Sequence, residues 1–172
     1  MATRPASLDE RAVVTEPALQ KAARAVFVRL RAVSDARLKR REDLVDDMKS
    51  PDPVVSVAAL VVLTERGDRQ AINGWKAELA VEDVRRVHRA IGALVELKAQ
   101  EAVAALIETA GPRDEVLHRE ILFALASLGG DEAAAYLAMV ADNHNHPILR
   151  NSAKLALEEL QAARQSADAG RK

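Results

Sequence analysis

The chain has 172 residues and a formal net charge of −1; 49% of its residues are hydrophobic, but only 2% are aromatic. Its apolar side chains are therefore mostly alanine, valine and leucine, which suit closely packed helices better than strands. Cysteine is absent, which excludes disulfides and cysteine-ligated zinc, and no run approaches the roughly 18 apolar residues of a membrane-spanning helix.

The N-terminal residues 1–16 are polar and show no hydrophobic periodicity, so we expect them to be flexible. They include no apolar run that could form the core of a signal peptide, and we therefore expect a cytoplasmic protein. Residues 17–49 are expected to form two helices that cap the N-terminal end of the domain. The first of these helices carries an apolar stripe at helical spacing, made of Leu19, Ala22, Ala23, Val26, Phe27 and Leu30.

Residues 50–160 form the main body of the chain and begin with the break Ser50-Pro51-Asp52-Pro53. Asp52 can cap the helix that follows, and Pro53 can occupy its first position, where the missing N–H costs nothing. Turn residues then recur at similar intervals as far as about residue 160. The polar tail 161–172 is expected to fray.

Every second helix expected in this body has a similar sequence, at offsets of 31, 31 and 32 residues. The segments are VSVAALVVL (55–63), RVHRAIGAL (86–94), LHREILFAL (117–125) and LRNSAKLAL (149–157). Their shared apolar positions end in Leu63, Leu94, Leu125 and Leu157 and fall on one helical face. A two-helix unit of about 30 residues predicts an all-α solenoid of about four helical hairpins, because one hairpin cannot bury its apolar face alone.

The stretches SPDPVVSVAALVVLTERGDRQAI and ALASLGGDEAAAYLAMV resemble HEAT repeats of the short bacterial kind, which also occur in phycobilisome lyase subunits. The resemblance covers Asp52 to about Leu160. It implies the solenoid fold and favours a bacterial source, but it implies no particular function. Arg66 departs from the repeat pattern, which places an apolar residue before the turn, and Arg86 occupies another position where the pattern is apolar.

The sequence contains no recognisable catalytic, cofactor-binding or phosphate-binding motif, and we expect no enzyme activity, no cofactor and no metal. His144 and His146 could contribute to a metal site with Asp142, but a polar loop that caps the next helix is the favoured interpretation. We expect His88 and His118 to lie on the surface, without the histidine–glutamate pairs that hold metal in some HEAT proteins. Trp75 is expected in the core.

Cationic side chains recur on the second helices of the hairpins, and in the solenoids that this chain resembles those helices line the concave face. The candidate partner-binding residues are Arg85, Arg86, Arg89, His118, Arg119, Arg150 and Lys154. Arginines in a groove can hold an acidic peptide or a phosphate through paired hydrogen bonds. The alternative is a solvated face with intrahelical ion pairs, such as Asp83 with Arg86.

Three classes of function remain open from the sequence. We favour a non-catalytic protein-interaction module, an adaptor or scaffold that binds a segment of another protein in its concave groove. A nucleic-acid binder could use the groove and the basic segment 37–41, but residues 42–160 contain 21 acids and 12 bases, a net charge of −9, which opposes phosphate binding. The third class is a subunit of a lyase-type enzyme. Self-association through an uncapped end of the solenoid is also open.

Overall fold

The structure, a computed structural model, describes residues 16–111 and 114–169, and within these ranges it contains helices and turns but no strand. The predicted all-α solenoid is confirmed. The elements are α1 (Glu16–Arg37), α2 (Arg41–Asp47), α3 (Pro53–Glu65), α4 (Ala71–Glu78), α5 (Val84–Glu96), the 3-10 helix η1 (Gln100–Ala102), α6 (Val103–Ala110), α7 (Glu115–Leu128), α8 (Asp131–Asn143) and α9 (Pro147–Ala169).

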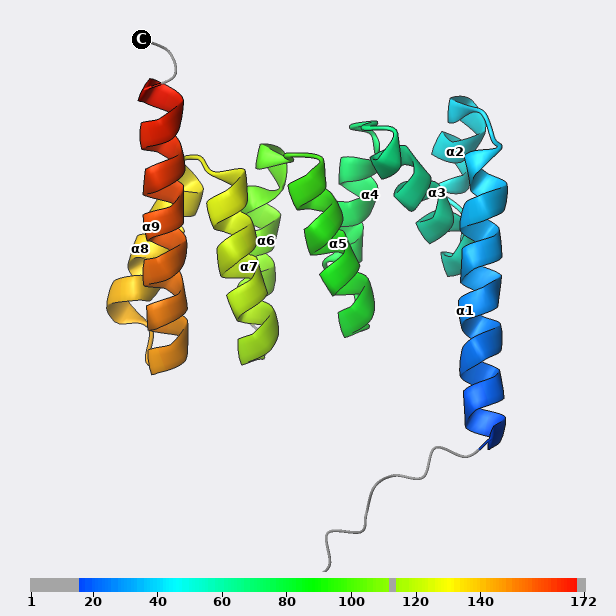
Figure 1. The fold of residues 1–172 in the computed structure, drawn as a ribbon, viewed down its shortest axis with the longest axis horizontal. Helices are drawn as coiled ribbons and strands as arrows, with labels where there is room; N and C mark the ends of the chain where they lie inside the picture. The colour runs from blue at the N-terminus through cyan, green and yellow to red at the C-terminus, as the bar shows by residue number, and fades with distance from the viewer. Residues whose placement is uncertain (1–15, 112–113, 170–172) are drawn as a thin grey trace, which may run out of the picture.

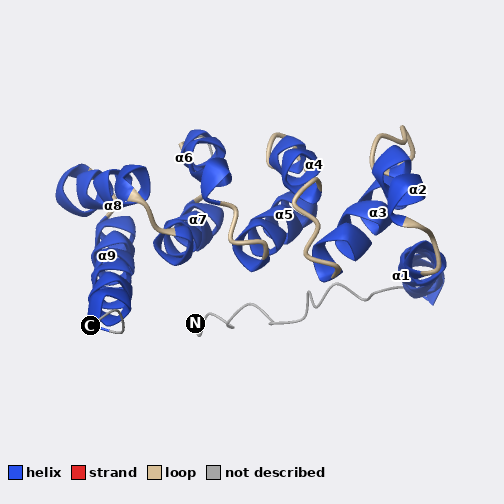
Figure 2. Ribbon diagram, turned by 90° about the horizontal axis from the view of Figure 1, so that it is seen from above, coloured by secondary structure: helices blue, strands red, loops and turns tan. Residues whose placement is uncertain are grey.

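The helices lie in two rows (Figures 1 and 2). One row, which we call the inner layer, contains α1, α3, α5, α7 and α9, and each of these helices packs on the next one in the row. The outer layer contains α2, α4, α6 and α8. In Figure 2 the inner row bows, with α1 and α9 set forward of the helices between them, so the exposed face of the inner layer is concave.

Four hairpins make up the solenoid: α2 with α3, α4 with α5, α6 with α7, and α8 with α9. We expected residues 17–49 to form a two-helix cap. The structure instead pairs α2 with α3 as the first hairpin, which leaves α1 alone as the N-terminal cap. The basic segment of the expected cap is therefore part of a junction between helices, described below.

Three inner helices begin with the same aspartate cap, repeated every 31 residues. The side chains of Asp52, Asp83 and Asp114 accept backbone hydrogen bonds from the first turns of α3, α5 and α7, at distances of 2.8, 2.9 and 3.0 Å. An aspartate at this position satisfies a backbone N–H that has no partner within the helix, and it complements the positive end of the helix dipole. The carboxylates at these helix starts therefore have a structural role.

The core follows the repeat that the sequence predicted. Leu63, Leu94 and Leu125 are fully buried between the layers, whereas Leu157 on the terminal helix α9 is only partly buried. The alanine-rich positions that precede them are also buried, so the helices approach closely at their crossings. Gly74 serves the same purpose on α4, because a Cβ atom there would collide with the side chain of Leu60.

The two ends of the solenoid differ from expectation. The apolar stripe of α1 packs into no core, and Leu19, Val26, Phe27 and Leu30 are each more than half exposed. At the other end, α9 continues to Ala169, beyond the point where we expected fraying to begin. The flexibility expected of residues 1–16 concerns residues outside the described ranges, apart from Glu16, with which α1 begins. None of the helices in the described ranges is long and apolar enough to cross a membrane.

Candidate functional site

A groove on the concave face lies between α1 and α5, with α3 as its floor. Figure 1 shows α1 and α5 on either side of α3, and Figure 2 shows α1 set forward at the end of the inner row. The groove holds about 360 Å³. Its apolar lining consists of Leu30 and Val33 from α1 and Pro53, Val54, Val57, Ala58 and Val61 from α3.

The floor is apolar because the first inner helix of the repeat region differs from those that follow it. Val57 and Val61 on α3 occupy the register positions of His88 and Gly92 on α5, 31 residues later. Both valines are only partly buried, since no other helix of the described chain covers this side of α3. A row of half-covered valines leaves apolar surface that a ligand can remove from water.

Four arginines border this apolar floor, and three of them have unpaired guanidinium groups in the described part of the chain. Arg29 comes from the α1 wall, and Arg85 and Arg89 come from the α5 wall, where they lie one helical turn apart. Within the described ranges, no carboxylate or carbonyl pairs with any of these three guanidinium groups. Among the described residues of the lining, Asp83 is the one acid, and its side chain accepts a hydrogen bond from the backbone N–H of Arg85. The groove therefore combines an apolar floor with unpaired positive charge.

Arg86 also borders the groove, but its guanidinium is already occupied. It forms a two-point ion pair with Glu78 of α4, with Nε–Oε2 and Nη2–Oε1 distances of 2.7 and 2.6 Å. The Glu78 side chain is only 10% exposed, and its hydrogen bonds raise the pKa of Arg86 above the ordinary arginine value. We expected Arg86 either to bind a partner or to pair with Asp83; the structure gives it a different, structural partner instead.

A family model described as HEAT repeats matches residues 72–158, just over half of the chain. The chain belongs to the HEAT-repeat family. The match begins in α4 and ends in α9, so it covers three of the four hairpins. It describes HEAT repeats in general, and the bacterial, lyase-type subtype remains a prediction. A search of the curated proteins finds no match to this chain.

Most of the groove lies outside the part of the chain that matches the HEAT-repeat family. Its floor and its α1 wall come from residues before position 72, and only the α5 wall lies within the matched range. The groove is therefore formed where a particular N-terminal helix meets the array. Family membership establishes the fold of the repeat array but neither the shape nor the chemistry of this groove.

Two other candidate residues have structural roles in this HEAT-repeat protein. His118 is buried, and its Nε2 atom lies 3.2 Å from the hydroxyl of Tyr136 on α8, so our expectation of a surface histidine in the groove was wrong. Burial, together with neighbouring His144, lowers the pKa of His118. Arg150 donates to the backbone carbonyls of His144 and Asn145 at 2.8 and 3.2 Å, and so fastens the turn between α8 and α9.

The buried position of His118 could have been found from the repeat. The residue 31 positions earlier is Val87, which is fully buried, and Ser56, 62 positions earlier, is buried as well. The same comparison applies to Arg86, which shares a register position with buried Leu117. A residue in a buried column of the repeat needs a partner within the chain, because isolated charge or polarity is costly there.

Arg119 and Lys154 are exposed, and the described part of the chain provides no partner for either side chain. They do not belong to the groove lining. The basic stripe predicted from the sequence is thus divided: Arg85 and Arg89 lie in the groove together with Arg29, which the sequence analysis did not single out. Arg29 was missed because the weak repeat signal before residue 50 gave no register between α1 and α5.

In the polar loop before α9, Nδ1 of His144 accepts a hydrogen bond from the backbone N–H of His146 at 3.1 Å, a contact within the loop rather than a cap of the helix. The Nε2 atom of His146 in turn lies 3.3 Å from a Glu115 carboxylate oxygen. In the described ranges, no group of three or more histidine, aspartate or glutamate side chains has the arrangement needed to hold a metal ion.

His88 pairs with Glu120, which lies on the next inner helix. We expected His88 to have no carboxylate partner, because it is followed by Arg89 rather than by a glutamate in the sequence. The partner comes from the following repeat, at a separation of 32 residues. This half-exposed contact links α5 to α7 on the concave face.

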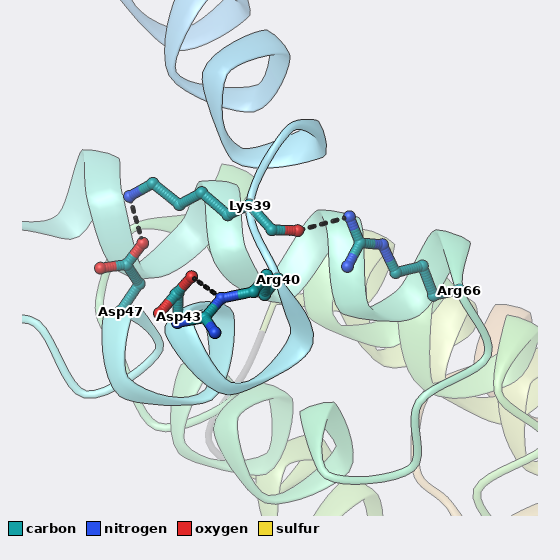
Figure 3. A network of polar contacts seen from close by, with 5 residues as sticks. All are labelled: Lys39, Arg40, Asp43, Asp47 and Arg66. Carbon is teal, nitrogen blue, oxygen red and sulfur yellow. Dashed lines mark hydrogen bonds and ion pairs between the residues drawn. The ribbon is translucent and has the colours of Figure 1, made fainter.

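The basic segment 37–41 is neutralised by acids of its own chain (Figure 3). Lys39 contacts Asp47 and Arg40 contacts Asp43 within the first hairpin region, and Arg41 contacts Asp68 at the turn after α3. Arg37 pairs with Glu65 at 2.6 Å. The side-chain hydrogen bonds from Arg37 and Arg41 lower the pKa values of the Glu65 and Asp68 carboxyl groups, respectively.

Arg66, the exception to the repeat pattern, completes the same junction (Figure 3). Its Nη2 atom lies 3.0 Å from the carbonyl oxygens of both Arg37 and Lys39, at the carboxyl end of α1. The last carbonyls of a helix lack partners within it, and a cation complements the negative end of the helix dipole. The arginine therefore helps to attach the cap helix α1 to the repeats.

Proposed function

We propose that this HEAT-repeat protein is a non-catalytic adaptor that binds a segment of another protein in the groove between α1 and α5. The observation that carries the proposal is the set of three unpaired arginines, Arg29, Arg85 and Arg89, around an apolar floor. The cations of the segment 37–41 are paired with carboxylates of the chain, whereas the guanidinium groups of these three arginines are available to a ligand. Apolar surface supplies affinity, and charge at the border supplies specificity.

The composition of the groove favours a protein over a nucleic acid as ligand. A protein binds a nucleic-acid backbone mainly through many cations along an extended face. Valine and leucine side chains make no favourable contact with phosphates. In the part of the chain that the structure describes, the groove has three unpaired cations, and the segment 37–41 that could have extended them is occupied by intramolecular ion pairs. A protein segment can use the apolar floor and the arginines together.

Among the residues that the structure describes, the groove lining offers few side chains of the kinds that enzymes use. These lining residues are arginine, leucine, valine, alanine, proline and a single aspartate, which already caps α5. None of these described residues carries a hydroxyl, thiol, amine or imidazole that could act as nucleophile or base. These observations support an adaptor rather than a lyase-type subunit.

Affinity purification from native cell extract tests the proposal, with nuclease present and at two salt concentrations. The groove variant is Arg85→Glu with Arg89→Glu, and the control is Arg119→Glu with Lys154→Glu, which reverses two unpaired exposed cations outside the groove. We expect a protein in stoichiometric amount with the wild type and the control, and its loss with the groove variant. Equal recovery with the groove variant, or recovery of nucleic acid alone, would contradict the proposal.

A further inference from the structure

We infer that the groove binds an amphipathic α-helix of the partner, with its apolar side on α1 and α3 and with carboxylates on both flanks. This inference rests on the proposed function and adds the shape and chemistry of the ligand. Four features of the chain support it: the direction of the apolar surface, the nature of the walls, the spacing of the arginines and the charge of α1.

The apolar surface extends along α1 beyond the groove. Leu30 and Val33 line the groove, and Val26 and Leu19, at successive helical repeats toward the N-terminus, are each more than half exposed. From Leu19 to Val33 the helix rises about 21 Å, at 1.5 Å per residue. An elongated ligand that lies along α1 would cover this whole surface, whereas a ligand that crosses α1 would cover only the groove.

The walls and floor of the groove are the sides of helices, whose backbone N–H and C=O groups are bonded within each helix. An extended ligand would lose its backbone hydrogen bonds to water here and find no backbone partner, which is unfavourable for each buried group. A helical ligand satisfies its own backbone groups. The groove therefore favours a helix, as in other helix-in-groove recognition.

The arginines define where the ligand carries negative charge. Arg85 and Arg89 are four residues apart on one face of α5, about 6 Å along the helix axis. A ligand helix that runs alongside would meet them with two carboxylates one turn apart. Arg29 on the opposite wall requires a further carboxylate on the other flank of the ligand's apolar stripe. Charge-assisted pairs of this kind are stronger than neutral hydrogen bonds.

A second copy of this chain does not fit that description. Its exposed apolar helix is α1, and α1 carries Lys21, Arg24 and Arg31 in addition to Arg29. Placed in the groove, this helix would bring cations toward Arg85 and Arg89, and like charges at close range are repulsive. The ligand is therefore an acidic amphipathic helix from a different protein.

Selection from a library of displayed random 16-residue peptides against the full chain tests the inference. Clones that bind wild type but not the triple variant Arg29→Glu, Arg85→Glu, Arg89→Glu are groove-dependent. We expect these clones to have apolar residues at intervals of three and four, with Asp or Glu pairs four residues apart. A synthetic peptide from this set should gain helical circular dichroism on binding and lose about tenfold or more in affinity when its acids become amides.

A second variant, Val26→Glu, lies on the exposed part of α1 outside the groove lining, so it tests the alignment of the ligand without disturbing the core. It should weaken the same peptide about tenfold, since it places a charge against the ligand's apolar side and its acids. Unchanged affinity in this variant would overturn the orientation along α1. The thermal melts of both variants should match that of the wild type.

Three further results would overturn the inference. Groove-dependent clones that alternate with a period of two, or that are basic, would exclude an acidic helix but leave the adaptor function standing. Self-association of the chain, measured by sedimentation and abolished by the triple variant, would make a second copy the occupant. A library with no groove-dependent clone would overturn both the helix and the groove as the protein-binding site.

Discussion

Thr64 is a buried residue of α3, and its hydroxyl group provides the hydrogen-bond acceptor for the buried side chain of Trp75. The indole Nε1 donates to Thr64 Oγ1 at 2.7 Å, and the same hydroxyl donates to the Leu60 carbonyl at 2.9 Å. A buried tryptophan needs an acceptor, because an unpaired N–H in the core loses its bond to water without replacement. The expected core position of Trp75 is thus confirmed, and the hydrogen bond to Thr64 satisfies its indole N–H.

Replacement Thr64→Val should destabilise the protein by about 1–3 kcal/mol, since the buried indole N–H loses its acceptor while the side-chain shape is kept. Urea denaturation followed by circular dichroism measures the change. Thr109→Val is the matched control: its hydroxyl bonds only to the carbonyl of Ala105, one turn earlier, so no donor is left unpaired. Equal losses in the two variants would show that the indole bond contributes nothing.

His118 gives the protein a stability that depends on pH. Burial lowers the pKa of His118 in the folded state, so below about pH 6.5 the unfolded chain binds a proton that the folded chain does not. Its contribution is therefore complete above pH 6.5 and is lost as the pH falls through the lowered value. We expect a smaller drop in stability between pH 7.5 and 5.5 for His118→Gln than for the wild type.

The matched control for His118 is Tyr136→Phe, which removes the neighbouring hydroxyl but keeps the titrating imidazole. It should retain the steeper pH dependence of the wild type, in denaturation experiments at each pH. If His118→Gln were as steep as the wild type, another group would be responsible for the dependence.

Helix α1 differs from the other inner helices in how it is held. It has one buried residue, Ala36, and it packs on α3 near its carboxyl end. Partly buried Ala32 and Val33 also pack against the core, and polar contacts add to this: the ion pair Arg37–Glu65 and the two hydrogen bonds from Arg66. An element with few buried apolar contacts opens at low free energy, so the position of the groove wall depends on these polar contacts.

Replacement Arg66→Ala should therefore loosen α1 more than the rest of the molecule. We expect a loss of about 1 kcal/mol for the exposed charge-assisted bonds and at least a fivefold faster hydrogen exchange in the last turns of α1. Arg69→Ala is the control, because Arg69 contacts the Leu97 carbonyl at the end of α5 and Glu101 in η1. Faster exchange in α1 with Arg69→Ala, or none with Arg66→Ala, would contradict this role.

The element scale also shows how far the sequence could predict the structure. The inner helices from α3 to α9 were predictable because the 31-residue recurrence of caps and core leucines reports both helix position and buried face. The stripe on α1 was recognised as amphipathic, but periodicity alone cannot say whether its apolar side meets the same chain. Glu78 with Arg86 and His88 with Glu120 were missed because such pairs join different helices, and only the packing sets their distances.

At the scale of the whole molecule, the solenoid is a linear array in which each hairpin contacts its neighbours. In such an array the stability is close to a sum of repeat and interface contributions, and a change in the middle affects two interfaces while a change at the end affects one. Leu94 lies in the central part of the core and Leu160 at its C-terminal end, and both are buried.

Leu94→Ala should cost about 2–5 kcal/mol and speed hydrogen exchange in hairpins on both sides of α5. Leu160→Ala should cost less and confine faster exchange to α8 and α9. Denaturation and exchange mapped by peptide measure the two effects. If hydrogen exchange became faster in all hairpins in both variants, the array would unfold as a single cooperative unit.

The junctions between repeats indicate how a repeat unit could be gained or lost in a related sequence. Arg69 donates a hydrogen bond to the carbonyl of Leu97 at the end of α5. One repeat later, Gln100 donates to the carbonyl of Leu128 at the end of α7. A unit of 31 residues thus carries its own cap and its own donor to the next unit. Duplication or loss of such a unit beyond α5 would repeat or remove one cap and one donor and alter the span by about 10 Å. The groove would still occur only once, because α1 is not part of the repeated unit and α3 and α5 would keep their places beside it.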